Sequence, residues 1–128
     1  MKYLVTGAAG FIGFHVVQDL LSQGAEVVGL DSINSYYSID LKYARLAESG
    51  IASKDVVAGV LTQSTTQANY RFIQLDLVDK DGLLQIFEQE KFDLVIHLAA
   101  QAGVRNSILH PEDYLHSNFS GFLNLLEC

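Results

Sequence analysis

Hydrophobic residues recur along the chain with two alternating periods. Short apolar runs rich in β-branched and aromatic residues occupy 2–6, 26–30, 70–75 and 92–97, and such runs are typical of buried strands. Between the first two runs, apolar residues stand at 11, 12, 16, 17, 20 and 21, which predicts a helix over 11–23. Strands that alternate with helices predict an α/β fold built on a parallel sheet.

Further helices are predicted around these strands, over 41–49, over 80–89 and from Pro111 to residue 128. A second short helix is expected around 55–62, ahead of a polar segment. A strand–helix–strand unit of this kind is parallel and right-handed. We therefore predict the N-terminal half of a Rossmann-like, doubly wound sheet with strand order 3-2-1-4, incomplete in these residues.

Composition narrows the class of protein. A chain of 128 residues predicts one domain over 1–128. Fifteen acidic and eight basic residues give a net charge of -7, a field that repels a nucleic-acid backbone. No apolar run approaches the roughly 18 residues of a membrane span, and the single cysteine, Cys128, has no internal partner. These features predict a cytoplasmic protein that binds neither nucleic acid nor membrane.

The stretch VTGAAGFIGFH, residues 5–15, places Gly7, Gly10 and Gly13 between the first strand and the first helix. In dinucleotide-binding turns the first glycine allows a tight turn, the second lets the backbone approach a pyrophosphate, and the third allows helix–strand packing. Free N–H groups at the helix N-terminus then bind the phosphates. The spacing is one residue longer than GxGxxG, and glycines also serve ordinary turns, so the motif depends on its context.

Acidic and small residues follow the next strands. Asp31 stands 24 positions after Gly7, where a carboxylate accepts hydrogen bonds from both adenosine ribose hydroxyls. A 2′-phosphate would meet like charge there, which favours NAD over NADP. Asp76 could accept a bond from the adenine amino group, and the alternative is a helix cap. Leu98, Ala99 and Ala100 would let a cofactor lie close to the backbone.

Several segments together resemble the extended short-chain dehydrogenase/reductase family, and within it the NAD-dependent nucleotide-sugar epimerases. They are VTGAAGFIGFH, the acid in GLDSIN, the DL at Asp76, HLAAQAGVR and SNFSGFLNLLE. The segments SYYSIDLKYARL and AAQAGVRNS are particularly similar to UDP-glucuronate 4-epimerases. The resemblance covers nearly the whole chain except residues 50–69.

The resemblance implies roles for individual residues. The pyrophosphate loop would consist of Gly7, Gly10, Phe11, Ile12 and Gly13, with Asp31 on the ribose, Asp76 and Leu77 at the adenine, and Ala99, Ala100 and Gln101 on the nicotinamide side. Asn118 would support the active-site backbone. Arg105 is the only lysine or arginine between 92 and 128 and is expected to hold a substrate carboxylate or phosphate; the alternative is a solvated loop arginine. No metal site is expected.

The resemblance also implies a reaction, in which NAD oxidises C4 of a UDP-sugar, with UDP-glucuronate as the first candidate, and returns the hydride to the other face. The base is a tyrosine followed four positions later by lysine. No tyrosine of this chain has that partner, so no catalytic residue is assigned. The 128 residues are expected to be inactive alone, with the catalytic and sugar-binding region further along.

Three alternatives stay open at this stage. A dehydratase or decarboxylase of nucleotide sugars would share these motifs, and so would an NAD-binding module without catalysis. The helix over 111–128 has two apolar stripes, which the resemblance relates to a homodimer interface. Packing of the same helix in the core is an equal explanation.

Overall fold

The computed structural model describes residues 1–128 and contains a five-stranded sheet. Its parallel strands are β1 (Lys2–Thr6), β2 (Glu26–Asp31), β4 (Tyr70–Gln74) and β5 (Leu94–His97). They lie in the order β4-β2-β1-β5, so the predicted fold class and the order of the four parallel strands are confirmed. A further strand, β3 (Thr62–Gln63), pairs antiparallel with β4 at the sheet edge.

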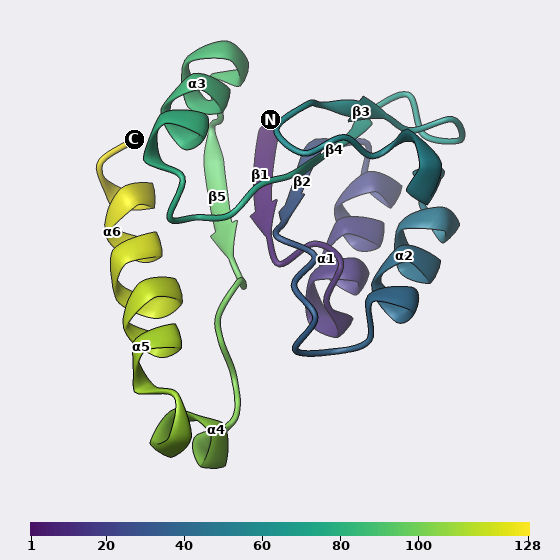
Figure 1. Ribbon diagram of the computed structural model, residues 1–128. Helices are drawn as coiled ribbons and strands as arrows, with labels where there is room; N and C mark the ends of the chain where they lie inside the picture. Colours follow the sequence, from purple (N-terminus) through teal and green to yellow (C-terminus); the bar gives the residue numbers. More distant parts are fainter.

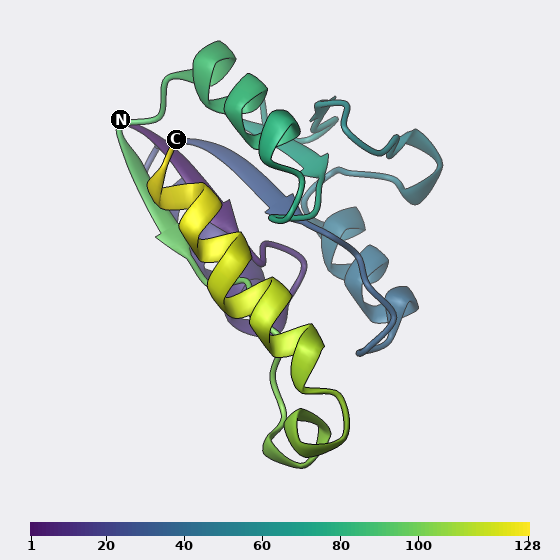
Figure 2. The same cartoon turned by 60° about the vertical axis from the view of Figure 1, so that its left-hand side comes forward.

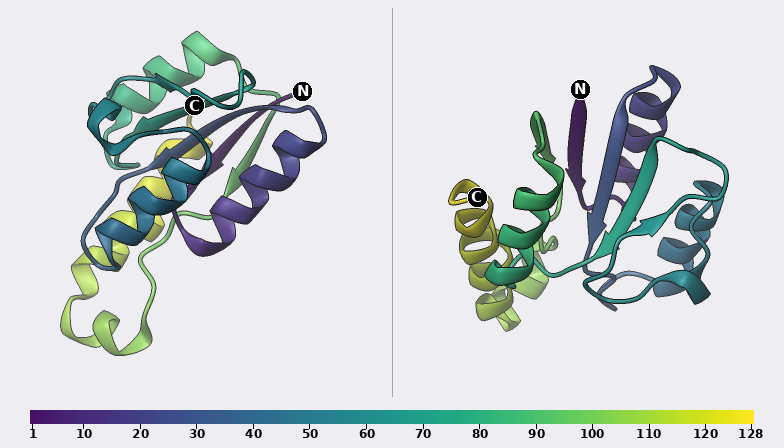
Figure 3. Two further views of the ribbon diagram at one scale, coloured as in Figure 1. Left: turned by 90° about the vertical axis from the view of Figure 1, so that its right-hand side faces the viewer. Right: turned by 90° about the horizontal axis from the view of Figure 1, so that it is seen from above.

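Helices cover both faces of the sheet and make a three-layer domain (Figure 1, Figure 3). One face carries α1 (Phe11–Ser22) and α2 (Ile39–Glu48). The other carries α3 (Lys80–Glu90) and a continuous helical segment made of α5 (Pro111–Tyr114), the π-helical η2 (Leu115–Ser120) and α6 (Gly121–Leu126). The short helix α4 (Val104–Leu109) precedes that segment.

Alternating side chains of the strands build two cores, one on each face. Val5, Val27 and Phe72 pack toward α1 and α2, whereas their neighbours Leu4, Val28 and Ile73 pack toward α3 and α6. A parallel strand covered on both sides needs apolar residues at every position. This requirement explains why the strands were recognisable as continuous apolar runs.

The segment between α2 and β4 differs from the prediction. The prediction of a helix around 55–62 is wrong, because only the single turn η1 (Ser53–Asp55) is helical and β3 follows it. The Ser64 hydroxyl donates to the Ser49 carbonyl at 2.7 Å, and the Thr65 N–H donates to the Gly50 carbonyl at 2.9 Å. The two ends of the intervening loop are therefore tied together beside the end of α2.

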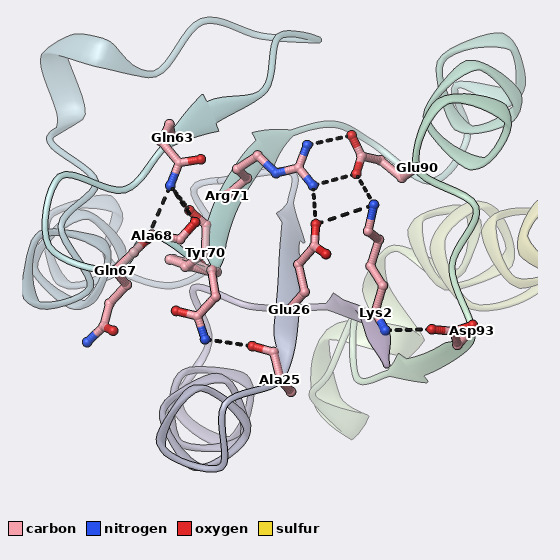
Figure 4. A network of polar contacts seen from close by, with 11 residues as sticks. Lys2, Ala25, Glu26, Gln63, Gln67, Ala68, Tyr70, Arg71, Glu90 and Asp93 are labelled. Atoms are coloured by element: carbon pink, nitrogen blue, oxygen red, sulfur yellow. Dashed lines mark hydrogen bonds and ion pairs between the residues drawn. The ribbon is translucent and has the colours of Figure 1, made fainter.

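Charged residues form a closed network at the amino ends of the strands (Figure 4). The Glu90 carboxylate, 3% exposed, accepts hydrogen bonds from both terminal nitrogens of Arg71 at 2.7 and 2.6 Å. Lys2 donates to the same carboxylate at 3.1 Å, and Glu26 pairs with both bases. Two acids and two bases thus neutralise one another and join β1, β2 and β4 to α3.

The segment α5–α6 lies along the sheet as one continuous helix (Figure 2). Gly121 and Leu125 are buried, and the Asn124 side chain donates to the Leu77 carbonyl at 2.8 Å. The opposite stripe is 43–70% exposed; it consists of Leu115, Phe119, Phe122 and Leu126. Within residues 1–128 one stripe is therefore buried and the other is largely exposed, apart from Phe122, whose ring stacks on His97 of β5; the homodimer contact and packing in the core both stay predictions.

Candidate functional site

A cavity of ≈ 720 Å³ opens at the carboxyl ends of the parallel strands. Its walls contain Gly7 after β1, Asp31 at the end of β2, Leu75 after β4 and Leu98 after β5. Open α/β sheets bind ligands at this edge, where the strand order reverses. The volume lies within the range of about 300–1,000 Å³ that is usual for ligand sites.

The residues predicted to bind the cofactor come together in this cavity. All twelve line it: Gly7, Gly10, Phe11, Ile12, Gly13, Asp31, Asp76, Leu77, Leu98, Ala99, Ala100 and Gln101. Arg105 does not line it. It lies in the helix α4 rather than in a loop and is exposed, so its contact with substrate stays a prediction.

The glycine loop has backbone geometry that demands glycine. Gly7 has φ +73°, in the left-handed region, and a Cβ there would lie 2.9 Å from the Ala99 nitrogen. A Cβ on Gly13 would lie 2.0 Å from the Gly7 carbonyl oxygen, a distance no side chain can accept. The turn out of β1 and the close packing of α1 on it explain two of the three glycines.

The first turn of α1 offers free donors to the cavity. The helix begins at Phe11, and no side chain caps it. The first N–H groups of a helix have no partner within it, and the helix dipole favours an anion beside them. Because Phe11, Ile12 and Gly13 line the cavity, this turn can bind a phosphate.

The Asp31 carboxylate is buried and partly used by the backbone. One oxygen accepts from the Ala9 N–H at 3.1 Å and the other from the Ile33 N–H at 2.9 Å. A carboxylate has about four acceptor sites, so two remain, the number that a ribose diol requires. Ile33 has φ +53°, a strained conformation for a β-branched residue that the bond to Asp31 stabilises.

Thr6 fixes the chain where it leaves β5. Its hydroxyl oxygen accepts from the N–H groups of Leu98 and Ala99, both at 3.1 Å, and lies 2.7 Å from His97 Nδ1. Since this oxygen already accepts two bonds, its proton is assigned to Nδ1 of a neutral imidazole. Burial lowers the pKa of His97, and the ring stacks on Phe122. His97 therefore has a packing role.

Asn118 and Asp76 hold neighbouring loops. The Asn118 amide accepts from the Gln101 N–H at 2.8 Å and donates to the Gln101 carbonyl at 3.1 Å. Its position within the π-helical η2 fits the frequent use of such segments at functional sites. Asp76 accepts from the Val78 N–H at 3.1 Å, whereas the cap of α3 is Asp79. The helix-cap alternative for Asp76 is therefore wrong, and its exposed side chain faces the cavity.

Sequence reasoning missed several residues of the cavity wall, above all Lys42 and Arg45 of α2 and the pair Tyr36–Tyr37. The segment SYYSIDLKYARL contains all four, and its similarity to epimerases was noted without a role for any of them. Two bases one helical turn apart were the available signal, because that spacing places them on the same helix face.

The arrangement suits a dinucleotide. It combines free N–H donors, a carboxylate with two open acceptor sites and an apolar wall from Leu30, Leu75 and Leu77. A second cavity of ≈ 570 Å³ beside α3 contains Asp79 and Asp81 but no lysine or arginine, so it is unsuited to phosphates. No cluster of three or more metal-ligating side chains is present. No helix has the length and apolarity needed to cross a bilayer.

Comparisons with known proteins identify the family. The family model described as "NAD dependent epimerase/dehydratase family" matches residues 3–128. The chain is 45% identical over 125 residues to the UDP-glucuronate 4-epimerase of Thermodesulfobacterium geofontis, covering 98% of this chain and 34% of the relative. It is 44% identical over 128 residues to Protein CapI of Staphylococcus aureus, covering 100% and 34%.

A solved structure, the UDP-glucose 4-epimerase of Thermus thermophilus in complex with NAD, matches with a TM-score of 0.72 and 35% identity. The match covers 99% of this chain and 33% of that one. The chain thus spans about a third of the length of these relatives. NAD as the cofactor and the nucleotide-sugar epimerase resemblance are confirmed, and the chain belongs to the NAD-dependent epimerase/dehydratase family.

Proposed function

We propose that residues 1–128 are the NAD-binding part of a UDP-sugar 4-epimerase, with UDP-glucuronate as the first candidate substrate. The observation that carries the proposal is the convergence of all twelve predicted cofactor residues on one cavity at the carboxyl edge of the sheet. Identity of 45% to a relative named UDP-glucuronate 4-epimerase supports the choice of sugar.

Within this proposal each part of the cavity has a task. NAD, when bound, supplies reversible removal of a hydride from the sugar carbon C4. The first turn of α1 binds the pyrophosphate, and Asp31 accepts the ribose hydroxyls. Thr6 and Asn118 hold residues 98–101 in place on the nicotinamide side. Asp76 and Leu77 contact the adenine, and Arg105 serves the substrate.

The test is to incubate the full natural protein with UDP-glucuronate and to measure UDP-galacturonate by anion-exchange chromatography. We expect the two sugars to be interconverted faster than UDP-glucose is epimerised. Loss of carbon dioxide would identify a decarboxylase, and loss of water a dehydratase. NAD binding without turnover of any nucleotide sugar would identify a non-catalytic module.

Two finer proposals complete this function. Residues 1–128 alone bind NAD without turnover, because no tyrosine among them has a lysine four positions later; turnover by that piece would contradict this.

The exposed stripe of α5–α6 makes a homodimer contact in the full protein. Sedimentation should show a dimer that Phe119→Glu converts to a monomer, since Phe119 is 70% exposed.

A further inference from the structure

The charges on the cavity wall are balanced although the chain as a whole is acidic. Lys42 and Arg45 are the only bases among the residues that line the cavity, and Asp31 and Asp76 are the only acids. The chain has a net charge of -7. Two of its eight bases therefore lie where an anionic ligand would be bound.

Lys42 is buried against the end of β2. Its ammonium lies 3.6 Å from an Asp31 oxygen, and its side chain is 9% exposed. It donates to the Asn34 carbonyl at 3.2 Å and to the Asn34 side-chain oxygen at 3.4 Å. A buried ammonium needs such compensation, and Asp31 is the only carboxylate that pairs with Lys42.

Arg45 contacts the glycine loop between β1 and α1. Its Nη1 donates to the Ala9 carbonyl at 3.0 Å, while the Ala9 N–H donates to Asp31 at 3.1 Å. A guanidinium has about five N–H donors, and this is the only hydrogen bond that Arg45 makes through its side chain. Arg45 therefore keeps donors available beside the residue that Asp31 holds.

We propose that Lys42 and Arg45 form a latent binding site for the 2′-phosphate of NADP, which the charge of Asp31 alone closes. The inference rests on the proposed position of the adenosine ribose at Asp31. With Asp31 ionised, a 2′-phosphate meets its negative charge and Lys42 is already paired. Without that charge Lys42 lacks a counterion, and a phosphate beside the ribose supplies one. Guanidinium and ammonium groups together are the usual partners of phosphate.

The experiment measures the affinity for NAD and for NADP by calorimetric titration of the full natural protein after bound nucleotide is removed. The variants are Asp31→Asn, Lys42→Met, Arg45→Gln, and Asp31→Asn combined with each of the other two. Lys54→Met is the matched control, because Lys54 is exposed and lies outside the cavity. Thermal unfolding is measured for every variant, and Asp31→Ser replaces Asp31→Asn if the latter does not fold.

The wild type should bind NAD and discriminate against NADP. Asp31→Asn should lower the affinity for NAD by about tenfold or more, because charge-assisted hydrogen bonds to the ribose are lost. It should raise the affinity for NADP by about tenfold or more, because the negative charge that repels the 2′-phosphate is removed. Adding Lys42→Met should abolish the gain in NADP affinity, and adding Arg45→Gln should reduce it. A residue with a purely structural role would weaken both nucleotides equally and leave their ratio unchanged.

Two results would overturn the inference in different ways. If the wild type binds NAD but Asp31→Asn gains no NADP affinity, or keeps the gain without Lys42 and Arg45, the latent site is disproved and the proposed function survives. If the wild type binds neither nucleotide, the proposed cofactor site fails and the latent site fails with it. Lys54→Met should match the wild type throughout.

Discussion

Two clusters of charged side chains, each built around one buried carboxylate, lie at opposite ends of the same parallel strands, and they differ in the hydrogen-bonding groups that they leave unused. At the amino ends, Glu90 is satisfied by Arg71 and Lys2, and the network closes on itself. At the carboxyl ends, Asp31 keeps acceptor sites and Arg45 keeps donors beside a cavity. A closed cluster stabilises the fold, whereas an open cluster can bind a ligand.

Glu90→Gln should produce the largest loss of stability. Removing the negative charge leaves Arg71 and Lys2 with Glu26 alone, and breaking a buried pair costs about 3–5 kcal/mol. Denaturant unfolding followed by circular dichroism should show this loss, while the NAD affinity of the folded protein stays unchanged. A change in NAD affinity would contradict the distinction between the two clusters, because the network around Glu90 would then influence nucleotide binding at the opposite end of the strands.

Gly13→Ala should instead impair NAD binding at the carboxyl ends of the strands. The new Cβ would meet the Gly7 carbonyl oxygen at 2.0 Å, so α1 or the glycine loop must shift. Overpacking of this kind costs about 1–3 kcal/mol, and the displaced N–H groups should lose most of the NAD affinity. Titration with NAD provides the test. Gly24→Ala is the control for a glycine change, since nothing lies within 4 Å of a Cβ there, although its positive φ adds some strain.

Lys2→Met should have a smaller, pH-dependent effect. Burial opposes the charge of Lys2, but its bonds to Glu90 and Glu26 outweigh burial and raise the pKa of the ammonium above 10.5. A raised pKa gives stability that is present below the unfolded-state pKa and is lost as pH rises through the folded-state pKa. The difference in unfolding free energy between wild type and Lys2→Met, about 1 kcal/mol at neutral pH, should therefore shrink in alkaline solution.

His97→Asn should give the smallest effect, at acidic pH. Burial lowers the pKa of His97 below its usual 6.5, so the folded protein favours the neutral ring. Stability from the neutral ring is present above the unfolded-state pKa and is lost as pH falls through the folded-state pKa. The midpoint temperature of thermal unfolding should fall more steeply between pH 7 and 5 for the wild type than for His97→Asn. Parallel profiles would show that the Thr6 bond does not depend on the protonation of His97.

The sequence predicted those parts of the fold that strong local patterns encode. Apolar runs located β1, β2, β4 and β5, and helical spacing located α1 and α3. β3 escaped prediction because Thr62 and Gln63 are polar and form a strand only through pairing with β4. The helix α4 was not predicted, and the π-helical η2 was predicted only as part of the helix over 111–128.

The candidate site divides in the same way. Gly7, Gly13 and Asp31 were recognisable because their backbone or charge requirement follows directly from their place after a strand. Lys42 and Arg45 were missed because their roles depend on contacts that the fold creates. The bond from Arg45 to Ala9 spans 36 positions, and no local pattern specifies it.

The tied loop between Ser49 and Ser64 provides a permissive insertion point. Its base is fixed by hydrogen bonds at 2.7 and 2.9 Å, and Val57 is 58% exposed and does not line the cavity. Lengthening a closed loop costs free energy that grows only slowly with its length. A peptide carrying a fluorescent reporter, inserted between Val57 and Ala58, would mark the protein without disturbing the nucleotide site.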